Sequence, residues 1–100
     1  MPEMTFSVRW PDGRVEDCYS PSLVMHDFLS AGTSYPVSDF AHRSVTALAI
    51  ASDRVREKFG FACTSAAATT EQVRRSAASY DPNALVTVLS LDPPLPQESR

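Results

Sequence analysis

The chain has 100 residues, of which 43% are hydrophobic and 21% are charged, and this composition is typical of one globular domain. Its formal net charge of −3 argues against a nonspecific nucleic-acid binder, because such proteins normally carry a basic patch. No apolar run reaches the roughly 18–20 residues of a membrane span, and the first residues lack a basic region followed by an apolar stretch. We therefore expect a cytoplasmic protein that does not enter the membrane.

Two strands joined by a tight turn are the first elements that the sequence predicts. Apolar and polar side chains alternate over residues 4–10, and this period of two is typical of a half-buried strand. Pro11 and Gly13 follow, and they suit a tight turn because proline presets φ and glycine accepts a positive φ. We expect residues 14–20 to form a second strand that runs back beside the first.

A short helix is predicted after this hairpin. Ser20 as the N-cap and Pro21 as the first helical residue favour a helix that ends near Leu29. Its inward-facing residues would be Leu23, Val24 and Phe28. Residues 32–36 are expected to form a loop.

A long amphipathic helix is predicted over residues 38–59. Apolar side chains recur there every three or four positions and form one stripe. The stripe consists of Phe40, Ala41, Ser44, Leu48, Ala51, Val55 and Phe59. Gly60 follows at the position where a left-handed C-terminal cap is expected.

The last third of the chain predicts one more helix and one more strand. Residues 61–68 are rich in small side chains and match neither pattern clearly. Thr69 is followed three residues later by Gln72, a capping-box spacing that predicts a helix from there to about Tyr80. Residues 84–91 are β-branched and apolar, which predicts a third strand beside the hairpin.

These elements predict an α+β fold. An N-terminal β-hairpin and a late third strand would form a small sheet packed against one long and two shorter helices. Residues 1–92 are expected to form a single domain, and residues 93–100 a proline-rich mobile tail. Because the third strand is apolar on both faces, we expect an exposed edge there to be buried in a homodimer or against a partner protein.

Cys63 is the most suggestive candidate for chemistry. A cysteine near the start of a helix or beside a histidinium can react as a thiolate, and the fold could bring His42 or His26 close to it. No local motif places a base beside this thiol, and most free cysteines are small buried hydrophobic residues, so the packing interpretation is favoured. Cys18 lies in a predicted strand and is expected to pack in the core.

Other chemical signatures are weak. Glu16 and Asp17 are adjacent on a predicted strand, so they point to opposite faces and cannot act as a pair of carboxylates. The two cysteines and two histidines share no metal-ligand spacing, and the three glycines are isolated from one another. We therefore expect neither a metal nor a nucleotide cofactor.

Three residues near the predicted turn are candidates for partner binding. Arg9, Trp10 and Arg14 lie close together in the sequence, and tryptophan and arginine are enriched at binding hot spots. The alternative is that Trp10 covers the edge of the core and has a structural role.

Several short strings carry a resemblance to a known family. They are Val-Arg-Trp-Pro-Asp-Gly at 8–13, Glu-Asp-Cys-Tyr-Ser-Pro-Ser at 16–22, Gly-Thr-Ser-Tyr-Pro at 32–36, Asp-Phe at 39–40, Arg-Ser at 43–44, Ala-Leu at 47–48, Ala-Ser-Asp-Arg-Val-Arg at 51–56 and Phe-Gly-Phe-Ala-Cys at 59–63. The sequence resembles a small bacterial family described as nitrogen-starvation-response proteins. This resemblance covers about the first two thirds of the chain and includes nothing specific from Thr64 onward.

The resemblance implies a pathway and a set of neighbours. Members of the family are encoded beside a nitrilase, a radical-SAM protein, an acetyltransferase-like protein and a flavin-dependent oxidoreductase, in clusters associated with nitrogen scavenging. It supplies no catalytic residues.

Two hypotheses about function follow. The favoured one is a small accessory protein without catalytic activity of its own, which binds a neighbouring pathway enzyme. The alternative is a small thiol-dependent enzyme or carrier that uses Cys63, with His42, on a nitrile-derived intermediate.

Overall fold

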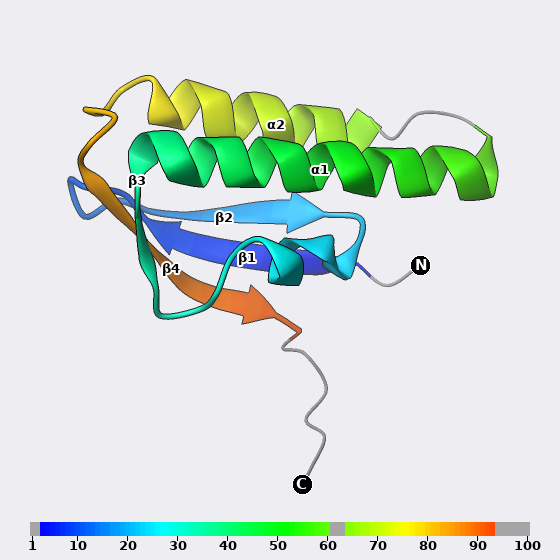
Figure 1. The fold of residues 1–100 in the computed structure, drawn as a ribbon, viewed down its shortest axis with the longest axis horizontal. Helices are drawn as coiled ribbons and strands as arrows, with labels where there is room; N and C mark the ends of the chain where they lie inside the picture. The colour runs from blue at the N-terminus through cyan, green and yellow to red at the C-terminus, as the bar shows by residue number, and fades with distance from the viewer. Residues whose placement is uncertain (1–2, 61–63, 94–100) are drawn as a thin grey trace, which may run out of the picture.

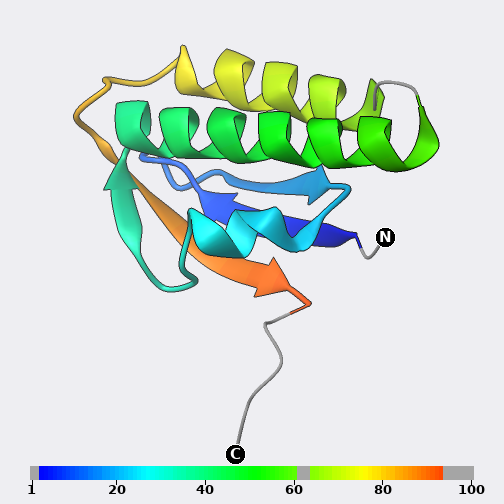
Figure 2. The same ribbon diagram turned by 45° about the vertical axis from the view of Figure 1, so that its right-hand side comes forward.

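The computed structural model describes residues 3–60 and 64–93, and it shows an α+β fold of two layers (Figure 1). The elements in chain order are β1 (Met4–Arg9), β2 (Val15–Ser20), the 3₁₀ helix η1 (Leu23–Asp27), β3 (Ser34–Pro36), α1 (Val37–Phe59), α2 (Thr64–Ala77) and β4 (Leu85–Asp92). All strand pairs are antiparallel, in the order β2–β1–β4–β3. Both α helices cover the same face of this sheet (Figure 2). The predicted α+β class is confirmed.

The predicted hairpin is present. The Gly13 N–H donates to the Trp10 carbonyl over 2.8 Å, and Gly13 has a φ of +93°, which favours glycine. Phe6 and Val8 are buried on the side that faces the helices, while the residues between them face outward. Because apolar and polar residues alternate along β1, one face of this strand is apolar and packs in the core.

The long helix is also confirmed, with a start at Val37 and an end at Phe59. Gly60 adopts the left-handed conformation at φ +84°, and its N–H donates to the Arg56 carbonyl over 2.7 Å. The buried stripe of α1 comprises Val37, Phe40, Ser44, Ala47, Leu48, Ala51 and Val55.

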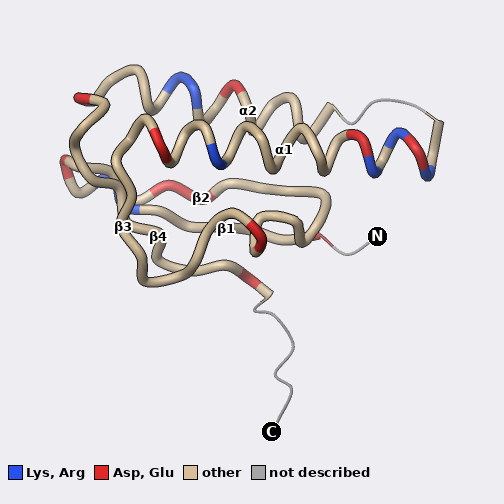
Figure 3. Tube along the Cα trace, viewed as in Figure 1, with Lys and Arg blue, Asp and Glu red and all other residues tan. Residues whose placement is uncertain are grey.

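Phe59 was expected in this stripe, but it is 52% exposed. The reason is length, because 23 helical residues span about 35 Å. The six residues of β1 span only about 20 Å. The last turns of α1 therefore extend past the sheet, and residues of both charges gather along them (Figure 3).

The short helix differs from its prediction in type and in cap. It is a 3₁₀ helix capped by Ser22, whose hydroxyl accepts a hydrogen bond from the Val24 N–H at 3.3 Å. Ser20 belongs to β2, and its hydroxyl donates to the Ser22 carbonyl over 2.8 Å. With three residues per turn, Val24 and Met25 become the buried pair, whereas Leu23 is only partly buried.

Residues 34–36 form a strand where a loop was expected. Strand β3 has only three residues and ends at Pro36, so it carries no periodic pattern. It pairs with β4, and the backbone pairing continues at Val88, whose N–H donates to the Thr33 carbonyl over 2.9 Å. The predicted third strand therefore lies between β1 and β3 rather than at an edge of the sheet. Its inward-facing residues Val86, Val88 and Leu91 are buried, whereas Leu85 on the opposite face is exposed.

Helix α2 begins at Thr64, five residues before the predicted N-cap. The capping box does not form, because Thr69 lies inside the helix and its hydroxyl donates to the Ser65 carbonyl over 3.1 Å. Three alanines at 66–68 favour helix and extend it toward the N-terminus. The helix ends at Ala77, three residues before its predicted end.

No helix among the described residues is long and apolar enough to cross a membrane. The predicted mobile tail consists, from residue 94 onward, of residues outside the described part of the chain.

Candidate functional site

The outer face of the sheet is the side that neither α helix covers, and it presents a small patch around Arg9. The register places Arg9 of β1 between Val15 of β2 and Thr87 of β4. Leu85 lies two residues from Thr87 on β4 and points to the same side. Val15 is 55% exposed and Leu85 is 56% exposed. We refer to Arg9, Val15, Leu85 and Thr87 as the outer-face patch.

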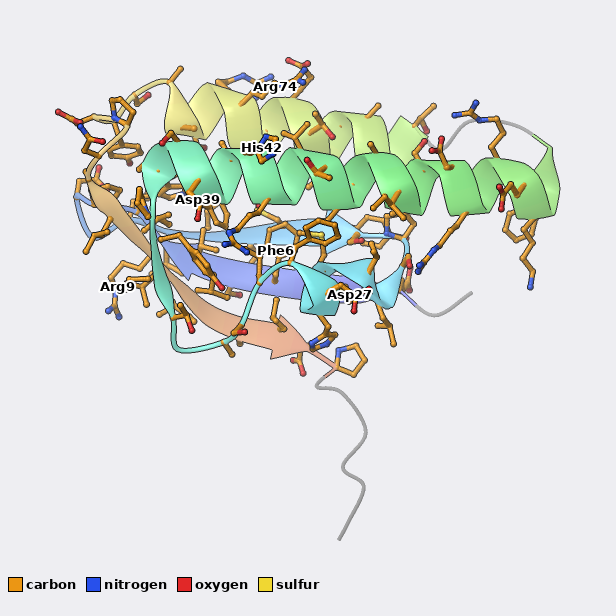
Figure 4. The ribbon with its side chains drawn as sticks, viewed as in Figure 1. Phe6, Arg9, Asp27, Asp39, His42 and Arg74 are labelled. Atoms are coloured by element: carbon orange, nitrogen blue, oxygen red, sulfur yellow. The ribbon has the colours of Figure 1, made fainter. Side chains whose placement is uncertain are left out.

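Arg9 is the charged centre of this patch and points away from the helices (Figure 4). Within residues 3–60 and 64–93, its guanidinium forms no ion pair. Several polar side chains around it are paired with one another: Ser7 donates to Asp17, and the Ser34 and Thr87 hydroxyls share a hydrogen bond of 2.8 Å. No carboxylate of the described residues therefore lies within ion-pair distance of Arg9.

Trp10 lies in the core rather than at the surface. Its side chain is 1% exposed and its ring stacks on Tyr80, with centroids 5.3 Å apart and planes 7° apart. The Phe40 ring forms a T-shaped pair with it, with planes at 90° and centroids 5.4 Å apart. This placement favours the structural role that was the alternative for Trp10.

A polar cluster surrounds the carboxylate of Glu16 on the inner side of β2. One carboxylate oxygen accepts hydrogen bonds from the Trp10 indole N–H at 2.8 Å and from the Ser76 hydroxyl at 2.7 Å. The other accepts from the Gln72 amide at 2.7 Å, and Arg14 forms an ion pair with Glu16 at 3.3 Å. We refer to these five residues as the Glu16 cluster.

The environment of Glu16 favours its charged form. Burial alone would raise the pKa of the carboxyl group, whose side chain is 14% exposed. Hydrogen bonds from Ser76, Gln72 and Trp10, together with the Arg14 charge, outweigh burial and lower the pKa below its ordinary value.

Arg14 was a candidate for partner binding, and the structure places it in the Glu16 cluster. Besides the ion pair with Glu16, it donates to the Ser76 hydroxyl over 3.1 Å. A hydrogen bond with Tyr80 raises its pKa, against an opposing effect of desolvation. Its charge is therefore already matched within the fold.

The thiol in the described part of the chain is not poised for chemistry. Cys18 is free and buried beneath the helical layer. Burial, and then the negative charges of Glu16 and Asp17, raise the pKa of this thiol to about 12. It is therefore protonated at neutral pH and acts as a core residue.

Cys63 lies outside the described residues. His42 is exposed on α1, and the His26 ring nitrogen lies 2.9 Å from the carbonyl oxygen of Pro93. The hypothesis that Cys63 works with His42 stays a prediction.

Two further features of the described residues supply no site for chemistry. No three histidine, cysteine, aspartate or glutamate side chains among them gather as metal ligands. A shallow groove of about 380 Å³ runs between α1 and α2, with Ala49 and Ala67 in its lining. The charged groups in its lining are Glu71 and Arg74, which pair with each other at 3.6 Å.

The comparison with known families decides the family. A family model described as nitrogen starvation-induced protein NitG matches residues 5–91. The chain belongs to the NitG family. The nitrogen-starvation resemblance is thus confirmed, and the NitG match extends well beyond Thr64, where no resemblance was noticed. No curated protein and no solved structure matches the chain.

Sequence reasoning missed three members of the outer-face patch, Val15, Leu85 and Thr87, and two members of the Glu16 cluster, Gln72 and Ser76. Val15 could have been found, since a tight turn that pairs residues 9 and 15 puts both side chains on one face. Gln72 and Ser76 could not, because they stand 56 and 60 residues from Glu16 and no local pattern relates them.

Proposed function

We propose that this protein of the nitrogen-starvation response is an accessory protein that binds an enzyme of a nitrogen-scavenging, nitrilase-associated pathway and has no catalytic activity of its own. The observation that carries the proposal is the outer-face patch, where the Arg9 guanidinium forms no ion pair with the described residues and has the exposed side chains of Val15 and Leu85 near it on the same face. Arginine surrounded by groups that exclude water is a common arrangement at binding hot spots.

The patch defines the chemistry of the partner. A carboxylate of the partner would reach Arg9, and apolar groups would cover Val15 and Leu85. The strands contain 6, 6, 3 and 8 residues, so at about 3.3 Å per residue and about 4.8 Å between strands the face covers about 360 Å². This is about half the area that one partner contributes to a standard interface, so we expect a transient complex in which Arg9 dominates the affinity. The cytoplasmic location expected from the sequence stays part of this proposal.

Co-purification with the neighbouring enzymes tests the proposal. The nitrilase, the radical-SAM protein, the acetyltransferase-like protein and the flavin-dependent oxidoreductase would each be co-expressed with the tagged protein. We expect one of them to be retained, and we expect Arg9→Glu to weaken that binding at least about 10-fold, because it sets like charges against each other. The matched control is Arg75→Glu, which makes the same charge change at an exposed position of α2.

Three results would count against the proposal. The first is that none of the four enzymes is retained. The second is that Arg9→Glu and Arg75→Glu weaken binding equally. The third is a wild-type dimer in light scattering that Arg9→Glu converts to monomer, because the occupant of the patch would then be a second copy of the chain.

A further inference from the structure

Helix α2 is attached to the rest of the fold by few apolar side chains. Its buried residues are Ala66, Thr69, Val73 and Ser76, and Val73 is the largest aliphatic side chain among them. Helix α1, by contrast, buries Phe40 and Leu48 completely or nearly so. Because stabilisation by burial scales with apolar area, α2 gains much less from its contacts than α1 does.

Helix α2 also has a limited set of neighbours. It packs against α1 on one side and against β2 on the other, and β2 is an edge strand of the sheet. Cys18 points from β2 toward the helical layer and is buried there. The described structure therefore places α2 as the cover of the inner side of β2, with Cys18 beneath it.

Hydrogen bonds from α2 to the hairpin add to the small stabilisation that α2 gains from buried apolar surface. Gln72 and Ser76 both donate to the carboxylate of Glu16, over 2.7 Å each. Gln72 donates in addition to the Asp17 carbonyl on the outer edge of β2, over 3.0 Å. Hydrogen bonds to a charged acceptor are stronger than neutral ones, so Glu16 concentrates the attachment at one point.

We propose that α2 opens from β2 as a unit while the rest of the fold stays intact, and that the Glu16 cluster is the latch that holds it closed. Elements with few buried apolar contacts open at a lower free-energy cost than the global unfolding of a domain. Opening uncovers the inner side of β2, including Cys18, and separates Gln72 and Ser76 from Glu16. This inference does not depend on the partner-binding function proposed for the outer face.

Labelling of Cys18 in the full-length protein tests the proposal. The protein is treated with N-ethylmaleimide under native conditions, and modification of the peptide that contains Cys18 is followed by mass spectrometry, which separates it from Cys63. We expect Gln72→Ala to increase the labelling rate by about 5- to 30-fold, because the latch loses two hydrogen bonds while the Glu16 charge, which raises the pKa of Cys18, stays in place. Glu71→Gln changes the neighbouring residue on the exposed side of α2 and is expected to leave the rate unchanged.

The dependence of labelling on denaturant separates opening of α2 from global unfolding. Opening one helix exposes less surface, so the labelling rate should rise less steeply with urea than the population of unfolded protein does. If Gln72→Ala does not fold, Ser76→Ala replaces it, since alanine favours helix and the change removes one hydrogen bond to Glu16. Equal slopes in urea, or equal rates in the latch variant and Glu71→Gln, would overturn the proposal.

Discussion

Among the described residues, Ser44 on α1 has a buried side-chain hydroxyl that forms no hydrogen bond. Its hydroxyl is fully buried among core residues and has no hydrogen-bond partner in the described structure. Burying an unpaired hydroxyl is unfavourable, and serine is also a poorer helix former than alanine. The apolar stripe predicted for α1 included this position correctly, although the residue type does not match the stripe.

Replacing Ser44 by alanine is therefore expected to stabilise the protein by about 0.5–1.5 kcal/mol. The measurement is the free energy of unfolding from urea titration. Ser76→Ala is the control, because the Ser76 hydroxyl has partners in Glu16 and Arg14 and its loss should destabilise by about 1 kcal/mol. A destabilising Ser44→Ala would show that the hydroxyl has a partner after all, such as a buried water.

Glu16 links stability to pH. Its pKa in the folded protein lies below the ordinary value of 4.5, so the folded state favours the charged carboxylate. The stability that it contributes is present above pH 4.5 and is lost as pH falls through the lower folded value. Asp12, at the hairpin turn, also has a lowered pKa, chiefly from the backbone N–H of Arg14, and acts in the same direction.

We therefore expect wild-type stability to decrease below about pH 4.5 and Glu16→Gln to be less sensitive to pH in that range. Urea unfolding at a series of pH values checks this, with the difference between the two proteins isolating Glu16 from Asp12. Parallel curves for the two proteins would contradict the assignment of the acid sensitivity to Glu16.

At the scale of elements, local patterns predicted those elements whose causes are local. The β1–β2 hairpin follows from alternation and from Pro11 and Gly13, and α1 follows from its apolar stripe and Gly60. Strand β3 was missed because three residues ending at Pro36 become a strand only when β4 lies beside them. The start of α2 was misplaced because the Thr69 hydroxyl has an equally good acceptor within the helix.

A substitution at Gly60 tests the predicted C-terminal end of α1. At φ +84° a side chain is strained, although apart from the adjoining backbone no atom of the described residues lies within 4 Å of the position that a Cβ would take. We expect Gly60→Ala to destabilise by about 1 kcal/mol through backbone strain alone. Thermal melting checks this against Glu57→Ala, an exposed position in the same last turns of α1. An unchanged midpoint for Gly60→Ala would mean that the end of α1 contributes nothing to stability.

The edges of the sheet show how elements protect one another. The outer edge of β2 is partly covered by the Gln72 side chain, which donates to the Asp17 carbonyl. The other edge is β3, which is short and ends in Pro36. Such features discourage edge-to-edge pairing between molecules. Strand β4 lies between β1 and β3, so the partner surface that we propose is the outer-face patch and not an edge of β4.

At the scale of the whole molecule, the fold class was predictable and the arrangement of polar groups was not. The periodicity of apolar residues assigns each residue to a buried or an exposed side. This is enough to predict an α+β fold whose core lies between the helices and the sheet. The Glu16 cluster and the Trp10–Tyr80 stack depend on contacts between residues far apart in sequence. Those contacts become visible only when the hairpin and α2 are placed together.

The strand order has a consequence for synthesis on the ribosome. The two central strands of the sheet, β1 and β4, are the first and the last strands of the described chain. At about 5–20 residues per second, roughly 4–15 s separate the appearance of Arg9 from that of Leu85. During that interval β1 has β2 as its neighbour on one side and nothing from β4 on the other. The sheet is therefore completed late in synthesis. A nascent chain that stalls before β4 leaves one edge of the apolar strand β1 accessible to chaperones and proteases.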